Sequence, residues 1–134
     1  MNFVSTRIIT ADVARLVDFY EKATGAKLTR YTEDFAELIT DAGTLAIGGT
    51  RTLQLFGGDH VAMPAANRTA IIEFRVADVD EEYRRLGSLI EGALVQAPTT
   101  MPWGNRSLLF RDPDGNLVNF FTPVTAEAIA KFAR

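Results

Sequence analysis

The chain has 134 residues, of which 47% are hydrophobic, and a formal net charge of −3. This length fits one compact domain with a real core, and the slight negative charge argues against nucleic-acid binding, which needs a basic surface. Cysteine is absent and His60 is the single histidine, which excludes disulfides, thiolate chemistry and a multi-histidine metal site within one chain. Without a signal peptide or an apolar run of about 20 residues, we expect a cytoplasmic protein with no membrane partner.

The first half of the chain predicts a strand, a helix and a group of short strands. Residues 3–10 alternate as a strand, Asp12 is placed to cap the helix that follows, and Gly25 is placed to end it. Three short strands are expected next, at residues 27–32, 35–40 and 44–48. Residues 52–56 fit either a further strand or a short helix, and the remainder up to residue 68 has the composition of a linker.

The second half predicts a similar order of elements. A strand at 69–76 precedes a helix capped by Asp78, with Glu81 three residues later as in a capping box. Strands are expected at 93–97, 107–111 and 116–121, and Asp112–Gly115 connects the last two as a tight turn. Thr125 is placed to cap a terminal helix. The small apolar stripe of that helix is expected to consist of Ala126, Ile129, Ala130 and Ala133, with Phe132 just off it.

An internal repeat relates the two halves at an offset of 66 residues. Ala11-Asp12-Val13 recurs as Ala77-Asp78-Val79, and the apolar positions of the two helices match at the same offset. The elements around both copies also follow the same order. One half alone would leave a sheet face uncovered, so we expect the two halves to pair around a shared core.

Three segments make the chain resemble the vicinal oxygen chelate superfamily, which contains glyoxalase I, extradiol dioxygenases and bleomycin resistance proteins. They are ADVARLVDFYEKATG, IIEFRVADVDEEYRRL and LLFRDPDGNLVNFF. The resemblance implies an α+β fold of two tandem βαβββ modules that form a curled mixed sheet around a cleft. It assigns module 1 to residues 1–50, a linker to 51–68, module 2 to 69–124 and a C-terminal helix to 125–134. It also implies a homodimer.

Metal-dependent members of that superfamily take their ligands from four inward strand positions. By the resemblance, three of these positions fall on Ser5, Ile71 and Asn119. The fourth remains open between Ala46, Ile47 and Gln54. None of these side chains is a carboxylate or an imidazole, and hydroxyl or neutral amide groups bind first-row divalent ions poorly. We therefore expect no metal ligands and no cofactor.

Strand alternation places Arg7 and Glu73 on the cleft face of the two predicted modules. The offset of 66 relates these two residues, so we expect them to approach each other. They can recognise a polar ligand group, with Arg7 as a forked donor, or they can form an ion pair that satisfies only itself. Glu73 is also the candidate catalytic base of a metal-free enzyme.

Trp103 is the candidate for stacking on a planar ligand, or else a rim residue packed on a neighbouring module or subunit. Tyr31 and Phe35 flank a turn and are candidate pocket walls, while core or interface packing is the alternative. The full set of candidate ligand-binding residues is Ser5, Arg7, Tyr31, Phe35, Glu73, Trp103, Asn105, Arg106, Asn119 and Phe121.

The resemblance and the missing ligands together favour a metal-independent binding protein like the bleomycin resistance branch. It would hold a small, partly aromatic ligand in a cleft of a dimer. The alternative is a glyoxalase- or dioxygenase-like enzyme, either metal-dependent or metal-free with Glu73 as base. Fold alone does not decide between them, because this scaffold hosts many chemistries.

Overall fold

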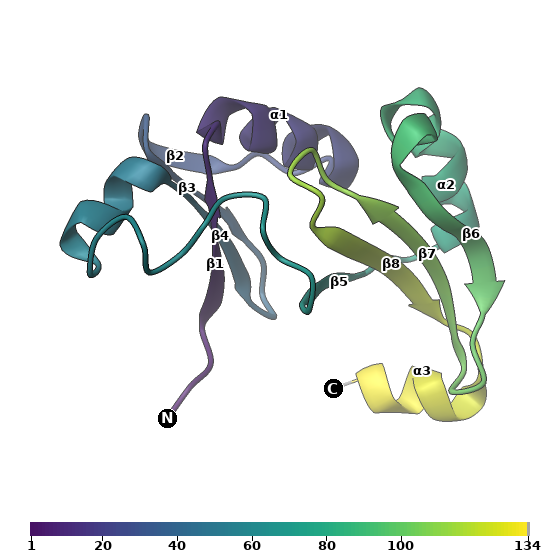
Figure 1. Ribbon diagram of the computed structural model, residues 1–134. Helices are drawn as coiled ribbons and strands as arrows, with labels where there is room; N and C mark the ends of the chain where they lie inside the picture. Colours follow the sequence, from purple (N-terminus) through teal and green to yellow (C-terminus); the bar gives the residue numbers. More distant parts are fainter. Residues whose placement is uncertain (134) are drawn as a thin grey trace. The chain divides into compact units, whose positions relative to one another are not determined.

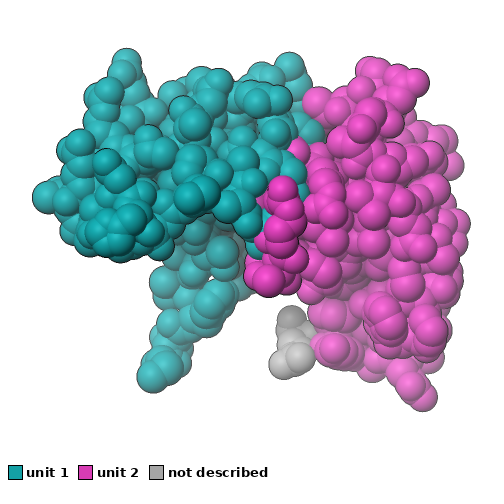
Figure 2. All heavy atoms as spheres, in the orientation of Figure 1, with its two compact units in different colours: residues 1–67, 113–115 teal, residues 68–112, 116–134 magenta. Residues whose placement is uncertain are grey.

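The computed structural model describes residues 1–133, and its chain forms two compact units (Figure 2). The first unit contains residues 1–67 and 113–115, and the second contains residues 68–112 and 116–134. Each unit holds one four-stranded mixed sheet with a helix, so the fold is α+β as predicted (Figure 1).

The first unit has the βαβββ order that the sequence predicts. Its elements are β1 (Ser5–Thr10), α1 (Val13–Thr24), β2 (Thr29–Thr32), β3 (Phe35–Ile39), β4 (Thr44–Gly49) and the 3₁₀-helix η1 (Thr50–Leu55). The sheet order is β1-β4-β3-β2, in which β1 pairs parallel with β4 and the other neighbours are antiparallel. Residues 50–55 are therefore helical, and the strand alternative for 52–56 is wrong.

The second unit repeats this topology. Its elements are β5 (Ile71–Arg75), α2 (Val79–Leu86), the 3₁₀-helices η2 (Gly87–Leu89) and η3 (Glu91–Ala93), β6 (Leu94–Thr100), β7 (Asn105–Arg111), β8 (Leu117–Pro123) and α3 (Ala126–Phe132). The sheet order β5-β8-β7-β6 matches that of the first unit, and β5 again pairs parallel with the last strand. The repeat at an offset of 66 is thus a repeat of structure.

Both main helices begin at the aspartates that the sequence marks. The side chain of Asp12 accepts a hydrogen bond from the backbone N–H of Arg15, and that of Asp78 accepts from Asp80 and Glu81. Each carboxylate satisfies backbone donors that have no partner inside the helix. Helix α1 ends at Gly25, whose φ of 72° is left-handed. The local signals for both helices are confirmed.

Each helix covers one face of its sheet with apolar side chains. In the first unit, Leu16 and Tyr20 of α1 are buried together with Leu38 and Ile47 of the sheet. In the second unit, the ring of Phe120 packs edge-to-face against Phe110 at 5.1 Å. We call the sheet face opposite the helix the open face of each unit. Because side chains alternate along a strand, Arg7 lies on the first open face, and Glu73 and Asn119 lie on the second.

The β7–β8 turn is fixed by two buried polar residues. The carboxylate of Asp112 accepts hydrogen bonds from the backbone N–H and the side-chain amide of Asn116, at 2.9 and 2.8 Å. Gly115 has a φ of 82°, as the predicted turn requires. The turn therefore depends on the first and last residues of the Asp112–Asn116 segment as well as on Pro113 and Gly115.

Helix α3 packs differently from the prediction. Thr125 does cap it, accepting from the backbone N–H of Ala128. The buried helix residue is Ala128, and the ring of Phe132 lies 5.2 Å from that of Phe121, whereas Ile129 is exposed. The predicted stripe is wrong because the start of the helix is anchored by the carbonyl of Gly104, which accepts from the backbone N–H groups of residues 124 and 125. This anchor turns the Ala128 side of the helix inward.

Gly104 supplies the first stability prediction. Its φ is +94°, and a Cβ atom there would lie 2.1 Å from Oγ1 of Thr125. We expect Gly104→Ala to lower the free energy of unfolding by about 1–3 kcal/mol, because it combines overpacking with an unfavourable backbone angle. Chemical denaturation measures the free energy of unfolding of the variant and of the wild type. Gly92→Ala is the matched control, since nothing lies within 4 Å of its Cβ position; equal losses in both variants would contradict the prediction.

Candidate functional site

Small residues of β4 line the open face of the first sheet. Arg7 on β1 pairs with Ala46 on β4, and the neighbouring Gly48 pairs with Phe35 on β3. A Cβ atom on Gly48 would lie 3.5 Å from Cδ of Arg7, so the arginine stem passes directly over this glycine. Small side chains on the middle strand therefore let Arg7 reach across β4 towards β3.

The guanidinium of Arg7 is held between two aromatic rings. Its Cζ atom lies 4.7 Å from the ring centroid of Phe35 and 4.7 Å from that of Phe56. Phe56 follows η1, and its backbone N–H donates to the carbonyl of Leu53, which fixes its position. Cation–π contacts stabilise a guanidinium without using its N–H groups. Among the described residues, no side chain or carbonyl accepts a hydrogen bond from Arg7, whose side chain is exposed to solvent.

Tyr31 and Glu37 extend this cluster along β2 and β3. The hydroxyl of Tyr31 donates to Oε1 of Glu37 at 2.9 Å, and its ring lies 5.8 Å from that of Phe35. The hydrogen bond raises the pKa of Tyr31 above its ordinary value of 10.0, because ionisation would place a phenolate beside a carboxylate. Tyr31 and Phe56 are exposed, so the cluster offers flat apolar surface beside the Arg7 donors.

This contact gives a pH prediction. Tyr31 is expected to ionise above 10.0, and Glu37→Gln is expected to move its midpoint back towards that value. The contribution of the hydrogen bond to stability is present below the pKa of the unfolded chain and is lost as pH rises through the folded pKa. Ultraviolet titration of tyrosinate measures the midpoint, with Tyr31→Phe identifying the signal. An unchanged midpoint in Glu37→Gln would contradict the assignment.

Glu73 and Asn119 form the polar centre of the second open face. They are register partners on the adjacent parallel strands β5 and β8, and Nδ2 of Asn119 donates to Oε2 of Glu73 at 2.8 Å. Asn119 is buried, whereas Glu73 is exposed. Arg7 and Glu73 thus each have partners within their own unit. Their predicted approach to each other stays a prediction.

The positions that the resemblance assigns to metal ligands carry side chains that do not suit a metal. Of Ala46 and Ile47, the register places Ala46 on the open face, since it pairs with Arg7, and Gln54 lies in η1. The side chains at the four positions are then a hydroxyl, a methyl group, an apolar isoleucine and an amide whose nitrogen faces Glu73. Among residues 1–133, no group of three or more His, Cys, Asp or Glu side chains is arranged to hold a metal ion. These residues do not fit the metal site of the superfamily.

Other predicted residues of the second unit lie away from the Glu73–Asn119 pair. Arg106 is on the α2-covered face, where it donates two hydrogen bonds to Asp80 at 2.9 and 3.1 Å and lowers the pKa of that carboxyl below 3.8. Trp103 lies in the exposed β6–β7 turn. Leu109 is the β7 residue that pairs with Asn119, and Asn105 precedes it by four residues at the start of β7. This separation is roughly 13 Å along the strand. The structure therefore brings neither Arg106 nor Trp103 to the Glu73–Asn119 pair.

The remaining predicted residues have simpler surroundings. Ser5 is exposed at the start of β1 and pairs with Thr44. Phe121 is buried against Phe132 of α3. Asn105 is partly buried, and its Oδ1 accepts no hydrogen bond among the described residues. Their predicted roles in ligand binding stay predictions.

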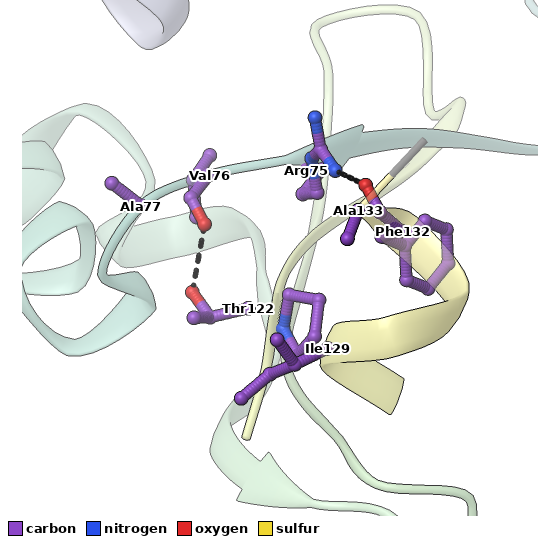
Figure 3. A pocket seen from close by; sticks show the side chains of 8 residues that line it. Arg75, Val76, Ala77, Thr122, Ile129, Phe132 and Ala133 are labelled. Atoms are coloured by element: carbon purple, nitrogen blue, oxygen red, sulfur yellow. Dashed lines mark hydrogen bonds between the residues drawn. The ribbon is translucent and has the colours of Figure 1, made fainter. Parts of the chain in front are cut away.

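A pocket of about 520 Å³ lies between α3 and the neighbouring strand ends of the second unit (Figure 3). The guanidinium of Arg75 donates to the carbonyl of Phe132 at its edge, and the hydroxyl of Thr122 donates to the carbonyl of Val76 at 3.0 Å. The lining residues are Arg75, Val76, Ala77, Thr122, Pro123, Ile129, Phe132 and Ala133. None of the predicted site residues is among them, and the polar groups named are bonded to each other, so we assign this pocket no function.

Phe56 and Glu37 are residues of this cluster that the sequence did not predict. Phe56 follows a segment that fits either a strand or a short helix, so its direction could not be inferred. A usable signal was the pair Ala46 and Gly48, which alternate on one face of a predicted strand. Two small residues there indicate that a long side chain from a neighbouring strand crosses them.

The comparisons with known proteins agree with this fold. The sequence profile of the Glyoxalase/Bleomycin resistance protein/Dioxygenase superfamily matches residues 2–120. The uncharacterized protein YwbC of Bacillus subtilis is 26% identical over 117 residues, covering 87% of this chain and 93% of YwbC. A protein of unknown function from Agrobacterium tumefaciens is 25% identical, with a TM-score of 0.76 over 91% of this chain and 94% of that one.

A glyoxalase/bleomycin resistance protein/dioxygenase family enzyme from Burkholderia phytofirmans shares 18% identity and a TM-score of 0.77, over 90% of this chain and 97% of the enzyme. At that identity the likeness concerns the fold alone. Within residues 1–133, no helix has the length and apolar character needed to cross a membrane. The sequence profile, the repeated βαβββ units and the matching folds lead to one conclusion: the chain belongs to the glyoxalase/bleomycin resistance protein/dioxygenase superfamily.

Proposed function

We propose that the protein is a metal-independent binding protein for a small aromatic molecule that carries a carboxylate or a similar oxyanion. The observation that supports this most directly is the Arg7 guanidinium, which is stacked between Phe35 and Phe56 while its donors have no acceptor among the described residues. A forked guanidinium matches the two oxygens of a carboxylate.

The surroundings of Arg7 favour an aromatic body on this ligand. Phe56 and Tyr31 expose their rings on the same face, and exposed aromatic rings stack on flat apolar groups. Glu37 is the nearby carboxylate, and its Oε1 already accepts the Tyr31 hydroxyl. The cluster therefore combines one exposed positive group with an apolar surface, which is the composition typical of small-molecule sites.

Ligand-observed NMR on chelator-treated protein tests the proposal. Benzoate, phenylacetate and larger aromatic acids are expected to bind, while benzamide and other neutral amides of the same shape bind weakly, because only the acids pair with Arg7. Equal responses from acids and amides, or binding that appears only after a divalent metal is added, would contradict it.

We further propose that the chain forms a homodimer, as its resemblance to the small bleomycin resistance proteins implies. Large apolar side chains exposed in the first unit support this, among them Leu55 and Met63. Light scattering coupled to gel filtration is expected to give twice the mass of one chain. The mass of a single chain across the accessible concentration range would contradict this part of the proposal.

A metal-free enzyme with Glu73 as base is the second candidate function. One observation favours it: Asn119 holds a single oxygen of the Glu73 carboxylate, which leaves the other available to take a proton. Turnover of an aromatic acid substrate that disappears in Glu73→Gln would support this reading.

A further inference from the structure

Arg7 and Glu37 lie in one register row on the open face of the first sheet. Arg7 on β1 pairs with Ala46 on β4, and Ala46 pairs with Glu37 on β3. Residues in register on neighbouring strands point to the same face of a sheet, so a guanidinium and a carboxylate stand on either side of Ala46. Ala46 is buried and adds no polar group that could pair with either charge. This face therefore carries one charge of each sign.

These two opposite charges do not pair with each other. Among residues 1–133, no ion pair joins Arg7 to Glu37. The Arg7 guanidinium lies instead over Phe35, with its Cζ atom 4.7 Å from the ring centroid. Phe35 precedes Glu37 by two residues on the same face of β3, which is roughly 7 Å along the strand. One small aromatic molecule can span such a gap between the two charged groups.

The Glu37 carboxylate has one oxygen that is held and one that is available. Oε1 accepts the hydroxyl of Tyr31 at 2.9 Å, which fixes the carboxylate beside that ring. Oε2 accepts no hydrogen bond from the described residues, and it is not one of the buried atoms that lack a partner. Because the Glu37 side chain is only half-buried and Arg7 is exposed, a ligand can reach both charged groups.

A ligand with a negative charge alone would use only part of this arrangement. Its oxyanion would pair with Arg7, but the neighbouring Glu37 carboxylate would repel it. An ammonium group at the other end of the ligand would donate to Oε2 of Glu37 and balance that charge. The aromatic body between the two groups would then lie against the exposed rings of Tyr31 and Phe56.

We propose that the ligand of this site is a zwitterion, whose oxyanion pairs with Arg7 and whose ammonium group pairs with Glu37. This inference rests on the proposed function and adds to it the second charge of the ligand and the residue that recognises it. Glu37 is then a residue that determines specificity as well as the acceptor that holds Tyr31. A glutamine at this position could still accept the Tyr31 hydroxyl through its amide oxygen, so Glu37→Gln removes the charge and keeps an acceptor.

The test compares two probes, 4-(aminomethyl)benzoate and 4-methylbenzoate, by NMR titration of chelator-treated protein. Both probes carry the carboxylate, and only the first carries an ammonium group. We expect the wild type to bind 4-(aminomethyl)benzoate about threefold to tenfold more tightly, as a partly exposed charge-assisted hydrogen bond implies. Glu37→Gln should abolish this preference and leave 4-methylbenzoate bound at least as well as before. Glu33→Gln is the matched control, because Glu33 is an exposed acid of the same unit, and it should keep the preference.

Equal affinity of the two probes for the wild type would overturn the inference, and so would a preference that persists in Glu37→Gln. Either result, obtained while 4-methylbenzoate still binds through Arg7, leaves the proposed function in place. If neither acid binds, the proposed function fails and this inference fails with it. The ratio of the two affinities in one sample does not depend on the fraction of folded protein, so a folding defect in a variant cannot imitate the expected result.

Discussion

Arg7→Gln is expected to weaken the binding of aromatic carboxylates about tenfold to a hundredfold. The neutral amide of glutamine cannot form the charge-assisted, two-pronged hydrogen bond with a carboxylate, and such bonds contribute about 1.5–3 kcal/mol. The stacking against Phe35 and Phe56 would be lost with the guanidinium. Isothermal titration calorimetry or an NMR titration with phenylacetate measures the change.

Two further variants separate charge from geometry at this position. Arg7→Lys keeps the positive charge but loses the planar fork and most of the stacking, so its affinity should lie between those of wild type and Arg7→Gln. Arg15→Gln changes an exposed arginine on α1 and should leave binding unchanged. Wild-type affinity in Arg7→Gln, or an equal loss in Arg15→Gln, would show that Arg7 does not bind the ligand.

Phe120→Ala is expected to have the largest effect on stability. Phe120 is 2% exposed on β8, and its ring packs edge-to-face against Phe110 at 5.1 Å and Phe74 at 5.5 Å. Truncating such a residue removes its buried area and leaves a cavity, which costs about 3–5 kcal/mol. That loss is a large part of the stability of a small domain. Urea denaturation followed by circular dichroism measures it.

The matched control is Phe3→Ala, because Phe3 is 86% exposed ahead of β1. Substitutions of this kind usually change stability by less than about 0.5 kcal/mol. Similar losses in Phe120→Ala and Phe3→Ala would mean that the α2-covered face of the second sheet is not the core that we describe.

The fold was predictable because its signals are local and occur twice. Asp12 and Asp78 stand at the same place in the repeat, and each caps the helix that its surrounding pattern predicts. The Asp112–Gly115 turn was equally readable, since proline and glycine restrict the backbone at known positions. What the sequence could not show is that the carboxylate of Asp112 is buried and bonded to Asn116, which depends on the packing of the whole hairpin.

The candidate site was predictable only in part. Strand alternation predicts the sheet face of Arg7 and of Asn119, because the period of a strand does not depend on tertiary contacts. Their place in one shared cleft stays a prediction. Phe56 was missed, since residues 50–55 carry no clear periodicity and form a 3₁₀-helix. Arg106 is one of the predicted ligand-binding residues, yet its position on β7 turns it to the α2-covered face, where Asp80 accepts its hydrogen bonds.

The expectation that the chain lacks metal ligands rests on single residues. Ile71 cannot donate an electron pair to a metal, and Asn119 directs its amide nitrogen towards Glu73. The choice between Ala46, Ile47 and Gln54 needed the strand register, which identifies Ala46. The small side chain of this alanine also leaves room for Arg7 to extend across β4.

The most direct measurement is a calorimetric titration of phenylacetate into chelator-treated wild-type protein and into Arg7→Gln. We predict saturable binding to the wild type that added Mn²⁺, Zn²⁺ or Ni²⁺ does not strengthen, and a loss of about tenfold or more in Arg7→Gln. Binding that requires one of these metals, or that is unchanged in Arg7→Gln, would contradict a metal-independent site built on Arg7, Phe35 and Phe56.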